Sequence, residues 1–402
     1  MFAPARSAPH LATLVILTAV SVLSLNMFLP SLAGIAEEFQ TDYALVSLSV
    51  SGYLAITAVL QIVLGPLSDR YGRRPVLLIG TAVFVVASLV CALAQEFWVF
   101  LTFRILQGAV IAGSAIASAV IRDTTDERGA ASLIGYVGMA MAVAPMLAPM
   151  LGGALDALWG WRASFWVYTV AGMVTLWLVW SDLGETNVTK SSKLMAQMRA
   201  YPELLRSRRF WAYSLCMAFG IGTFFIFLAG APLVAVSVFG MSSALLGFGI
   251  GTITMGFFCG SFLSGRFSTR MGLMWMIMAG RIVALGGLGL GLMLYGAGWF
   301  NEVVFFGAAI CVGIGNGLTS PSARAGAMSV RPGLAGSASG LSGALIVGAG
   351  AVLTVVPGMV LTPENGAWVL LALMGVTSVL AMATAVYLLL LDRRECQAAQ
   401  SR

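Results

Sequence analysis

Long apolar runs constrain this chain more than any other feature of its sequence. Residues 11–25 and 76–93 are nearly continuous apolar stretches. Because lipid offers no partners to backbone N–H and C=O groups, such segments cross a membrane only as helices or as strands of a closed barrel. Barrel strands alternate apolar and polar residues over about 10 positions, and these runs do not alternate. The pattern therefore predicts membrane-spanning helices.

The overall composition agrees with a membrane protein. Hydrophobic residues make up 59% of the chain and charged residues 9%, whereas soluble domains carry roughly 25% charge. The net charge of +6 does not indicate nucleic-acid binding, because the Lys and Arg residues fall in short alternate loops, as the positive-inside rule requires. The 5 cysteines are scattered, which indicates neither a disulfide framework nor a metal site.

Charged and Gly/Pro-rich breaks divide the chain into about twelve spans of an all-α membrane protein. The longest polar stretch, residues 183–209, is predicted to be a cytoplasmic linker. It separates an N-terminal six-helix bundle, residues 1–182, from a C-terminal six-helix bundle, residues 210–402. The basic loops place both termini on the cytoplasmic side of the inner membrane. We expect a monomer embedded in the lipid bilayer.

The loop between the second and third predicted spans reads GPLSDRYGRRPVLL and carries the most specific signal in the chain. Gly65 and Gly72 permit a tight reversal of the backbone. Asp69 lies one helical turn before Arg73, a spacing that allows an ion pair at the membrane edge. A basic anchor of membrane topology would explain Arg70 and Arg73, but it would not explain Asp69 or the glycines.

The fourth predicted span contains a cation, Arg104, followed one helical turn later by Gln107. A charge inside the bilayer costs roughly 2.5–3.5 kcal/mol on insertion scales and is rarely kept without a role. The two side chains share a helix face, so we interpret them as polar groups of a cavity. The alternative is that Arg104 snorkels to the interface near Trp98. Arg281 in the ninth span is a second such cation, with both interpretations open.

The fifth predicted span combines prolines with small residues. Pro145 and Pro149 each remove a backbone donor, and Gly152 and Gly153 let another helix approach closely. Ordinary tight helix packing also uses small residues. The order of small residues and prolines over about fifteen positions favours a specific motif.

Together these features resemble the major facilitator superfamily. Residues 65–78 match the signature loop of that family, residues 104–108 resemble its second motif, and the fifth span resembles the motif of its drug exporters. The resemblance implies two six-helix halves with a substrate site between them. It also implies that the loop is a cytoplasmic latch, in which Asp69 faces the start of the eleventh helix and Arg73 pairs with Asp123.

Residues 26–30 (NMFLP) and 222–227 (GTFFIF) resemble the branch of that superfamily that confers resistance to bicyclomycin and to chloramphenicol or florfenicol. This resemblance implies export of drug-like molecules, with amphenicol antibiotics as candidate substrates, in exchange for protons by alternating access. The branch usually has an aspartate at the position of Asn26. Because asparagine does not titrate, the site of proton coupling is open, and Asp123 with the latch is the alternative.

The expected substrate cavity is lined by polar and aromatic side chains from four spans: Asn26, Phe28, Tyr53, Arg104, Gln107, Phe224 and Phe227. The missing carboxylate keeps a second hypothesis open, namely an uncoupled facilitator or a narrow exporter of one metabolite. A membrane sensor without transport is disfavoured because no signalling domain is recognisable. The sequence shows no nucleotide-binding loop, metal cluster or catalytic triad, so we expect neither an enzyme nor a bound cofactor.

Overall fold

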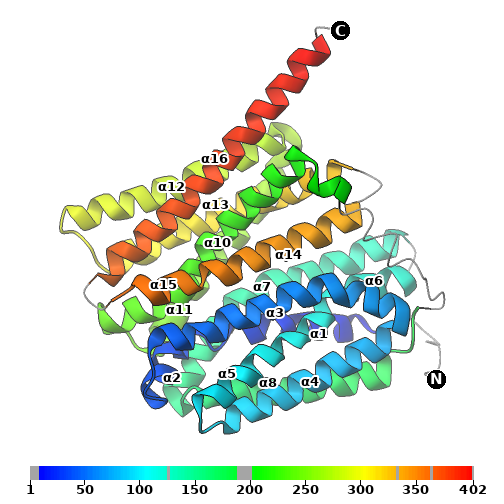
Figure 1. Ribbon diagram of the computed structural model, residues 1–402, viewed down its shortest axis with the longest axis vertical. Coiled ribbons are helices and arrows are strands. Elements are labelled where there is room, and N and C mark those ends of the chain that lie inside the picture. Colours follow the sequence, from blue (N-terminus) through cyan, green and yellow to red (C-terminus); the bar gives the residue numbers. More distant parts are fainter. Residues whose placement is uncertain (1–8, 125–126, 188–201, 332–334, 363–364, 401–402) are drawn as a thin grey trace. The chain divides into compact units, whose positions relative to one another are not determined.

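The computed structural model describes residues 9–124, 127–187, 202–331, 335–362 and 365–400, and these ranges are almost entirely helical (Figure 1). The chain forms two compact units. The N-unit comprises Met1–Leu194 with Ser242–Gly251, and the C-unit comprises Met195–Met241 with Thr252–Arg402. Each unit is described separately below.

The helices of the N-unit include two short 3₁₀ turns, labelled η. They are α1 (Leu11–Asn26), η1 (Leu29–Ser31), α2 (Leu32–Glu38), α3 (Tyr43–Tyr71), α4 (Arg73–Leu93), α5 (Phe97–Leu106), η2 (Gln107–Val110), α6 (Ile111–Thr124), α7 (Glu127–Trp159) and α8 (Arg162–Asp182). Its apolar core contains fully buried side chains from α1, α4 and α6, such as Leu17, Leu77 and Val120. Helix α8 packs against α4, and α7 packs against α1.

The C-unit contains the second set of long helices. They are α10 (Arg208–Ser237), α11 (Ser243–Met271), α12 (Leu273–Gly296), α13 (Glu302–Ser329), α14 (Ala335–Leu353), α15 (Val355–Val360) and α16 (Gly366–Gln400), with the first residues of α11 counted in the N-unit. Helix α12 packs against both α13 and α16. Phe210, Ile277 and Leu388 are buried together in the core of this unit.

Membrane crossing follows from the length and the apolar composition of these helices. In the described part of the chain, 10 helices are long and apolar enough to cross a bilayer, and two shorter apolar helical stretches, Phe97–Gly113 and Leu147–Trp159, fall where the fourth and fifth spans were predicted. A helix rises about 1.5 Å per residue, so roughly 20 residues cross the hydrocarbon core. The prediction of a helical multi-pass membrane protein is confirmed.

The turn between α3 and α4 depends on one glycine rather than two. Gly72 separates the helices and has φ +108° and ψ 151°, a conformation that is open essentially to glycine alone. Gly65 lies inside α3, so the prediction that it helps to reverse the chain is wrong. Helix α3 continues past Gly65 to Tyr71, and a glycine inside a helix needs no special backbone angles.

The fourth span is less regular than the sequence indicated. Helix α5 ends at Leu106, the four residues Gln107–Val110 form a 3₁₀ turn, and α6 resumes at Ile111. Such a tighter stretch inside a helical span often marks a functional hinge or local strain. Here it begins at Gln107 itself, three residues after Arg104.

Arg281 on α12 forms the polar centre of the C-unit. The guanidinium is 1% exposed. Its Nε donates to Thr319 Oγ1 at 3.0 Å, and its Nη2 donates to Gly315 O at 3.0 Å and to Asn316 Oδ1 at 2.7 Å. Asn316 Nδ2 in turn donates to Gly220 O at 2.8 Å. Arg281 therefore joins α12 to α13 and, through Asn316, to α10, so its snorkelling to the interface is excluded.

We expect Asn316→Ala to destabilise the protein. The variant removes an acceptor from a fully buried cation and a donor from the Gly220 carbonyl, and a hydrogen bond to a charged group contributes about 1.5–3 kcal/mol. The check is the Tm of detergent-solubilised protein. Thr319→Val removes one bond to Arg281 and should lower Tm by less than Asn316→Ala does. An unchanged Tm in Asn316→Ala would show that Arg281 does not hold the three helices together.

Candidate functional site

Arg104 lies in the last turn of α5 with its side chain completely buried in the N-unit. Its Nη1 donates to Gln107 Oε1 at 2.5 Å and its Nη2 donates to Ser24 O at 2.8 Å. Gln107 is held in place because its Nε2 donates to Ser88 Oγ at 2.7 Å. The acceptors around the guanidinium are therefore neutral groups. The snorkelling alternative for Arg104 is wrong.

Aromatic rings surround the same guanidinium. The Arg104 Cζ lies 4.0 Å from the ring centroid of Phe28, 4.5 Å from that of Tyr53 and 6.0 Å from that of Phe165. A cation over a ring face is stabilised by about 0.5–2 kcal/mol, most strongly where water is excluded. The Tyr53 hydroxyl also lies 2.6 Å from Ser24 Oγ, so the cage and the hydrogen-bonded groups form one cluster.

The aromatic contacts continue from this cluster toward the first residues of α8. Phe165 packs edge-on against Phe100 with centroids 5.4 Å apart, and Phe100 packs against Trp161 at 5.4 Å. Trp161 Nε1 donates to Glu38 Oε2 at 2.6 Å, and Glu38 forms an ion pair with Arg162. A continuous series of ring contacts thus connects the buried cation to the ion pair between Glu38, the last residue of α2, and Arg162, the first residue of α8.

The predicted cavity residues are only partly brought together. Phe28, Tyr53, Arg104 and Gln107 form the cluster described above, and Ser24, Ser88 and Phe165 join them without having been predicted. A serine or a phenylalanine in an apolar helix gives no sign of which neighbour it will meet. The sequence offered no signal for these three residues.

The other predicted cavity residues make different contacts. Asn26 is the last residue of α1, is buried, and donates from Nδ2 to Val22 O of its own helix at 2.9 Å. Phe224 and Phe227 lie on α10 in the C-unit. Phe227 is fully buried and packs against Phe305 of α13 with centroids 5.5 Å apart, whereas Phe224 is half-buried. Phe227 is therefore part of the packed core of its unit.

The signature loop forms the ion pairs that the sequence predicted. Arg73 Nη1 lies 2.5 Å from Asp69 Oδ1, and Arg73 Nε lies 3.3 Å from Asp123 Oδ2 on α6. Arg73 Nη1 also donates to Ser68 Oγ. Arg70 points away to solvent and lies over the ring of Tyr71 at 5.3 Å. The predicted pairing of Arg73 with both carboxylates is confirmed, and Arg70 takes no part in it.

A short segment after α8 docks onto this loop and was not predicted. Glu185 Oε1 accepts from the backbone N–H of Arg73 at 2.9 Å, and Asn187 Nδ2 donates to Asp69 O at 2.8 Å. Thr186 Oγ1 donates to Asp123 Oδ2 at 3.4 Å. We call residues 185–187 the strap. An acid just after a span that ends near a basic loop was the signal available in the sequence.

The proline and glycine motif lies on α7, which continues as one helix through Pro145 and Pro149. A Cβ at Gly152 would collide with the carbonyl group of Met27, the residue that follows α1. Gly152 therefore allows the close contact between α7 and the end of α1. Gly153 is buried on the same helix.

We expect Gly72→Ala to lower the Tm of detergent-solubilised protein more than Gly272→Ala does. Both positions have positive φ, which costs a non-glycine residue about 1–3 kcal/mol. Only at Gly72 would the new methyl group collide with the Glu185 carboxylate, because nothing lies within 4 Å at Gly272. Combining Gly72→Ala with Glu185→Ala should therefore cost less than the two single losses added together. Equal losses at Gly72 and Gly272 would contradict docking of the strap.

Comparison with known proteins places this geometry in context. The chain is 28% identical to multidrug resistance protein D of Escherichia coli over 93% of this chain and 95% of that protein. It is 34% identical to a chloramphenicol resistance protein of Pseudomonas aeruginosa and 32% identical to the uncharacterized MFS-type transporter YdgK of Bacillus subtilis. Those two matches cover 57% and 61% of this chain, and 54% and 62% of the respective relatives.

Among solved structures, the fold matches a bacterial homolog of the human lysosomal transporter Spinster in an inward-facing and occupied conformation. The TM-score is 0.76, the identity is 17%, and the match covers 95% of this chain and 96% of the other. At this identity the likeness concerns the fold alone, and it confirms the predicted twelve-helix architecture. A family model described as Major Facilitator Superfamily matches residues 14–355, and the chain therefore belongs to that superfamily.

Proposed function

We propose that this protein is a secondary active transporter that exports drug-like small molecules in exchange for protons. Membership of the superfamily makes it a membrane transporter rather than an enzyme. Relatives named for multidrug, chloramphenicol and bicyclomycin resistance support drug efflux. Amphenicol antibiotics are the substrates that we propose to test first, because one of these relatives is named for chloramphenicol.

The observation that carries this proposal is the Arg104 cluster. The hydrogen-bond acceptors of this buried cation are neutral and bring no opposite charge to it, and aromatic rings beside it suit apolar ligands of varied shape. Arg104, Gln107, Phe28 and Tyr53 are buried in this structure, so in this proposal a conformational change exposes them to drug-like molecules with electron-rich oxygens and aromatic rings. Asn26, Phe224 and Phe227 remain proposed contacts for substrate, although Phe227 would first have to leave its core packing.

We place the protein in the inner membrane with both termini in the cytoplasm, as a monomer. The basic loop residues support this orientation, because the loop with Arg70 and Arg73 belongs on the cytoplasmic side under the positive-inside rule. The ion pairs of Arg73 with Asp69 and Asp123 then form a cytoplasmic latch. In this proposal, Gly72 and the strap maintain the backbone conformation of the latch. The small residues of α7 allow the end of α1 to approach closely.

An uncoupled facilitator, or an exporter of a single metabolite, is the second candidate. It is favoured by Asn26, whose amide bonds to its own helix and offers no titratable group. If protons do drive export, we propose that the carboxylates of Asp69, Asp123 and Glu185 around Arg73 are where they bind. Protonation there would weaken the hold on Arg73, so proton binding and opening of the latch would be linked.

We expect Arg104→Ala to abolish chloramphenicol export and Arg104→Lys to retain part of it. Lysine keeps the charge but not the planar fork that reaches Gln107 and Ser24 together. The measurement is drug accumulation in cells, normalised to the amount of protein in the membrane. Arg208→Ala, an exposed site at the start of α10, is the control for loss of one positive charge. Export by Arg104→Ala at the native rate would remove this residue from the substrate site.

We expect Asn26→Asp to make export more dependent on the proton gradient. A protonated aspartic acid can donate to Val22 O as Asn26 does, whereas the ionised form cannot, so the two protonation states differ in this buried position. Export of a neutral and a cationic drug is measured across imposed pH gradients, with Asn26→Ser as the non-titratable control. The native protein should handle the neutral drug better. Steep gradient dependence in the native protein and no change in Asn26→Asp would place the proton site elsewhere.

A further inference from the structure

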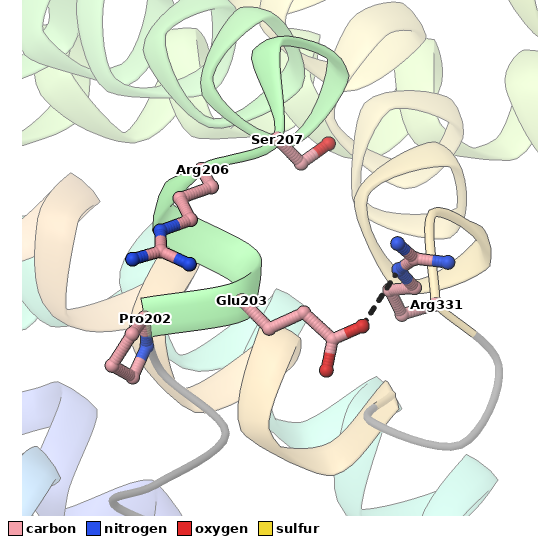
Figure 2. Close-up of a pocket in the computed structure, with 5 residues that line it drawn as sticks. All are labelled: Pro202, Glu203, Arg206, Ser207 and Arg331. Carbon is pink, nitrogen blue, oxygen red and sulfur yellow. Dashed lines mark ion pairs between the residues drawn. The ribbon is translucent and has the colours of Figure 1, made fainter.

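A cavity of about 550 Å³ lies at the start of α10 in the C-unit (Figure 2). It is lined by Pro202, Glu203, Arg206, Ser207 and Arg331. Pro202 and Glu203 lie in a short helical segment (residues 202–205), Arg206 and Ser207 link it to α10, and Arg331 comes two residues after the end of α13. Neither the Arg104 cluster nor the loop with Arg73 contributes to this cavity. The cavity is therefore distinct from the proposed substrate site and from the proposed latch.

The segment that forms one wall of the cavity is firmly anchored. Leu204 is fully buried in the apolar core of the C-unit. Arg206 N donates to Pro202 O at 3.1 Å, and Ser207 N donates to Leu204 O at 3.0 Å. Ser207 Oγ accepts from Phe210 N at 3.3 Å and thereby caps α10. The backbone positions of Glu203 and Arg206 are thus fixed before any ligand binds, which lowers the entropic cost of binding.

The charges in the cavity are two guanidiniums and one carboxylate. Arg331 Nε lies 3.1 Å from Glu203 Oε1, and both side chains are more than half exposed. An ion pair this exposed contributes only about 0–1 kcal/mol, so it rearranges easily. No described residue bonds to the terminal nitrogens of Arg331 or to the Arg206 guanidinium, which Figure 2 shows on the opposite side of the cavity from Arg331. These donors are available to a ligand, and the net charge favours an anion.

We propose that this cavity binds a phosphate group, carried either by the headgroup of an anionic phospholipid or by free phosphate. The planar donor fork of arginine matches phosphate oxygens and binds them through paired hydrogen bonds. Under the proposed orientation this basic pocket lies at the cytoplasmic end of its helices, where it can meet lipid headgroups. The volume of the cavity leaves room for a glycerol headgroup beside the phosphate. Glu203 competes with the ligand for Arg331.

Because Glu203 competes with the ligand for Arg331, loss of an arginine and loss of Glu203 should change phosphatidylglycerol binding in opposite directions. Arg206→Gln and Arg331→Gln should each weaken phosphatidylglycerol binding by about tenfold, the loss of roughly one charged hydrogen bond. Glu203→Gln should strengthen it severalfold, because the amide neither repels phosphate nor holds Arg331 as strongly. Arg208→Gln removes the same charge from an exposed residue that does not line the cavity, and it should change binding by less than about twofold.

The experiment uses native mass spectrometry of the full-length protein in detergent, titrated with dioleoyl-phosphatidylglycerol. Dioleoylglycerol, which has the same acyl chains without phosphate, tests whether the phosphate is recognised. Inorganic phosphate is added as a competitor in a second arm. Competition at millimolar concentration or below identifies free phosphate as a sufficient ligand, whereas resistance to it identifies the lipid headgroup, and either result supports the proposal.

Three results would overturn the proposal. The first is equal binding of the phospholipid and dioleoylglycerol with no binding of inorganic phosphate. The second is unchanged binding in Arg331→Gln and Arg206→Gln while the Tm of both variants stays native. The third is weaker binding in Glu203→Gln, which would show that the Glu203 carboxylate helps to form the site and does not compete with phosphate for Arg331.

Discussion

A guanidinium that is shut off from water must find its hydrogen bonds inside the protein, and this requirement organises the N-unit. Arg104 donates to the backbone carbonyl of Ser24 on α1 and to the side-chain amide oxygen of Gln107. Gln107 in turn donates to the hydroxyl of Ser88 on α4. Phe28 adds a ring face. Removing one acceptor would leave a buried charge partly unpaired, which costs far more than an ordinary hydrogen bond. The helices that carry these groups are therefore coupled through one side chain.

The C-unit meets the same requirement with different residues. Arg281 uses Thr319, Asn316 and a backbone carbonyl, again without a carboxylate partner among the described residues. Neutral acceptors take part of the hydrogen bonds of each guanidinium, while Arg104 Nε and Arg281 Nη1 have no hydrogen-bond partner among the described residues, and neutral acceptors do not cancel the charge. In a low-dielectric interior, the field of an uncancelled charge reaches further than in water. In the proposed function, the uncancelled charge of Arg104 opposes the binding of cationic drugs, which is the reason for the proposed preference for neutral or zwitterionic substrates.

The features that were predicted correctly from the sequence depend on the composition of whole segments or on residues close together in the chain. Apolar runs specified the helices because the need to satisfy the backbone in lipid acts on whole segments, and the spacing of Asp69 and Arg73 specified their ion pair. Contacts set by tertiary packing were not predictable. Phe227 lies in a helix that is apolar all round, so no periodicity distinguishes core from cavity. The acid after the sixth span was the one available signal for the docking of Glu185, and nothing in the sequence indicates that its partner is a loop more than 100 residues away.

The strap changes how the signature loop can act. The loop was predicted as one arginine between two acids, but the structure adds a third carboxylate, which binds the backbone of Arg73 rather than its side chain. Asp69 and Asp123 can therefore release the guanidinium while Glu185 still holds the start of α4. Side-chain pairing and backbone position are thus separately controlled in this loop. If the loop is the latch that we propose, its charge contacts can change while Glu185 keeps the turn at Gly72 in place.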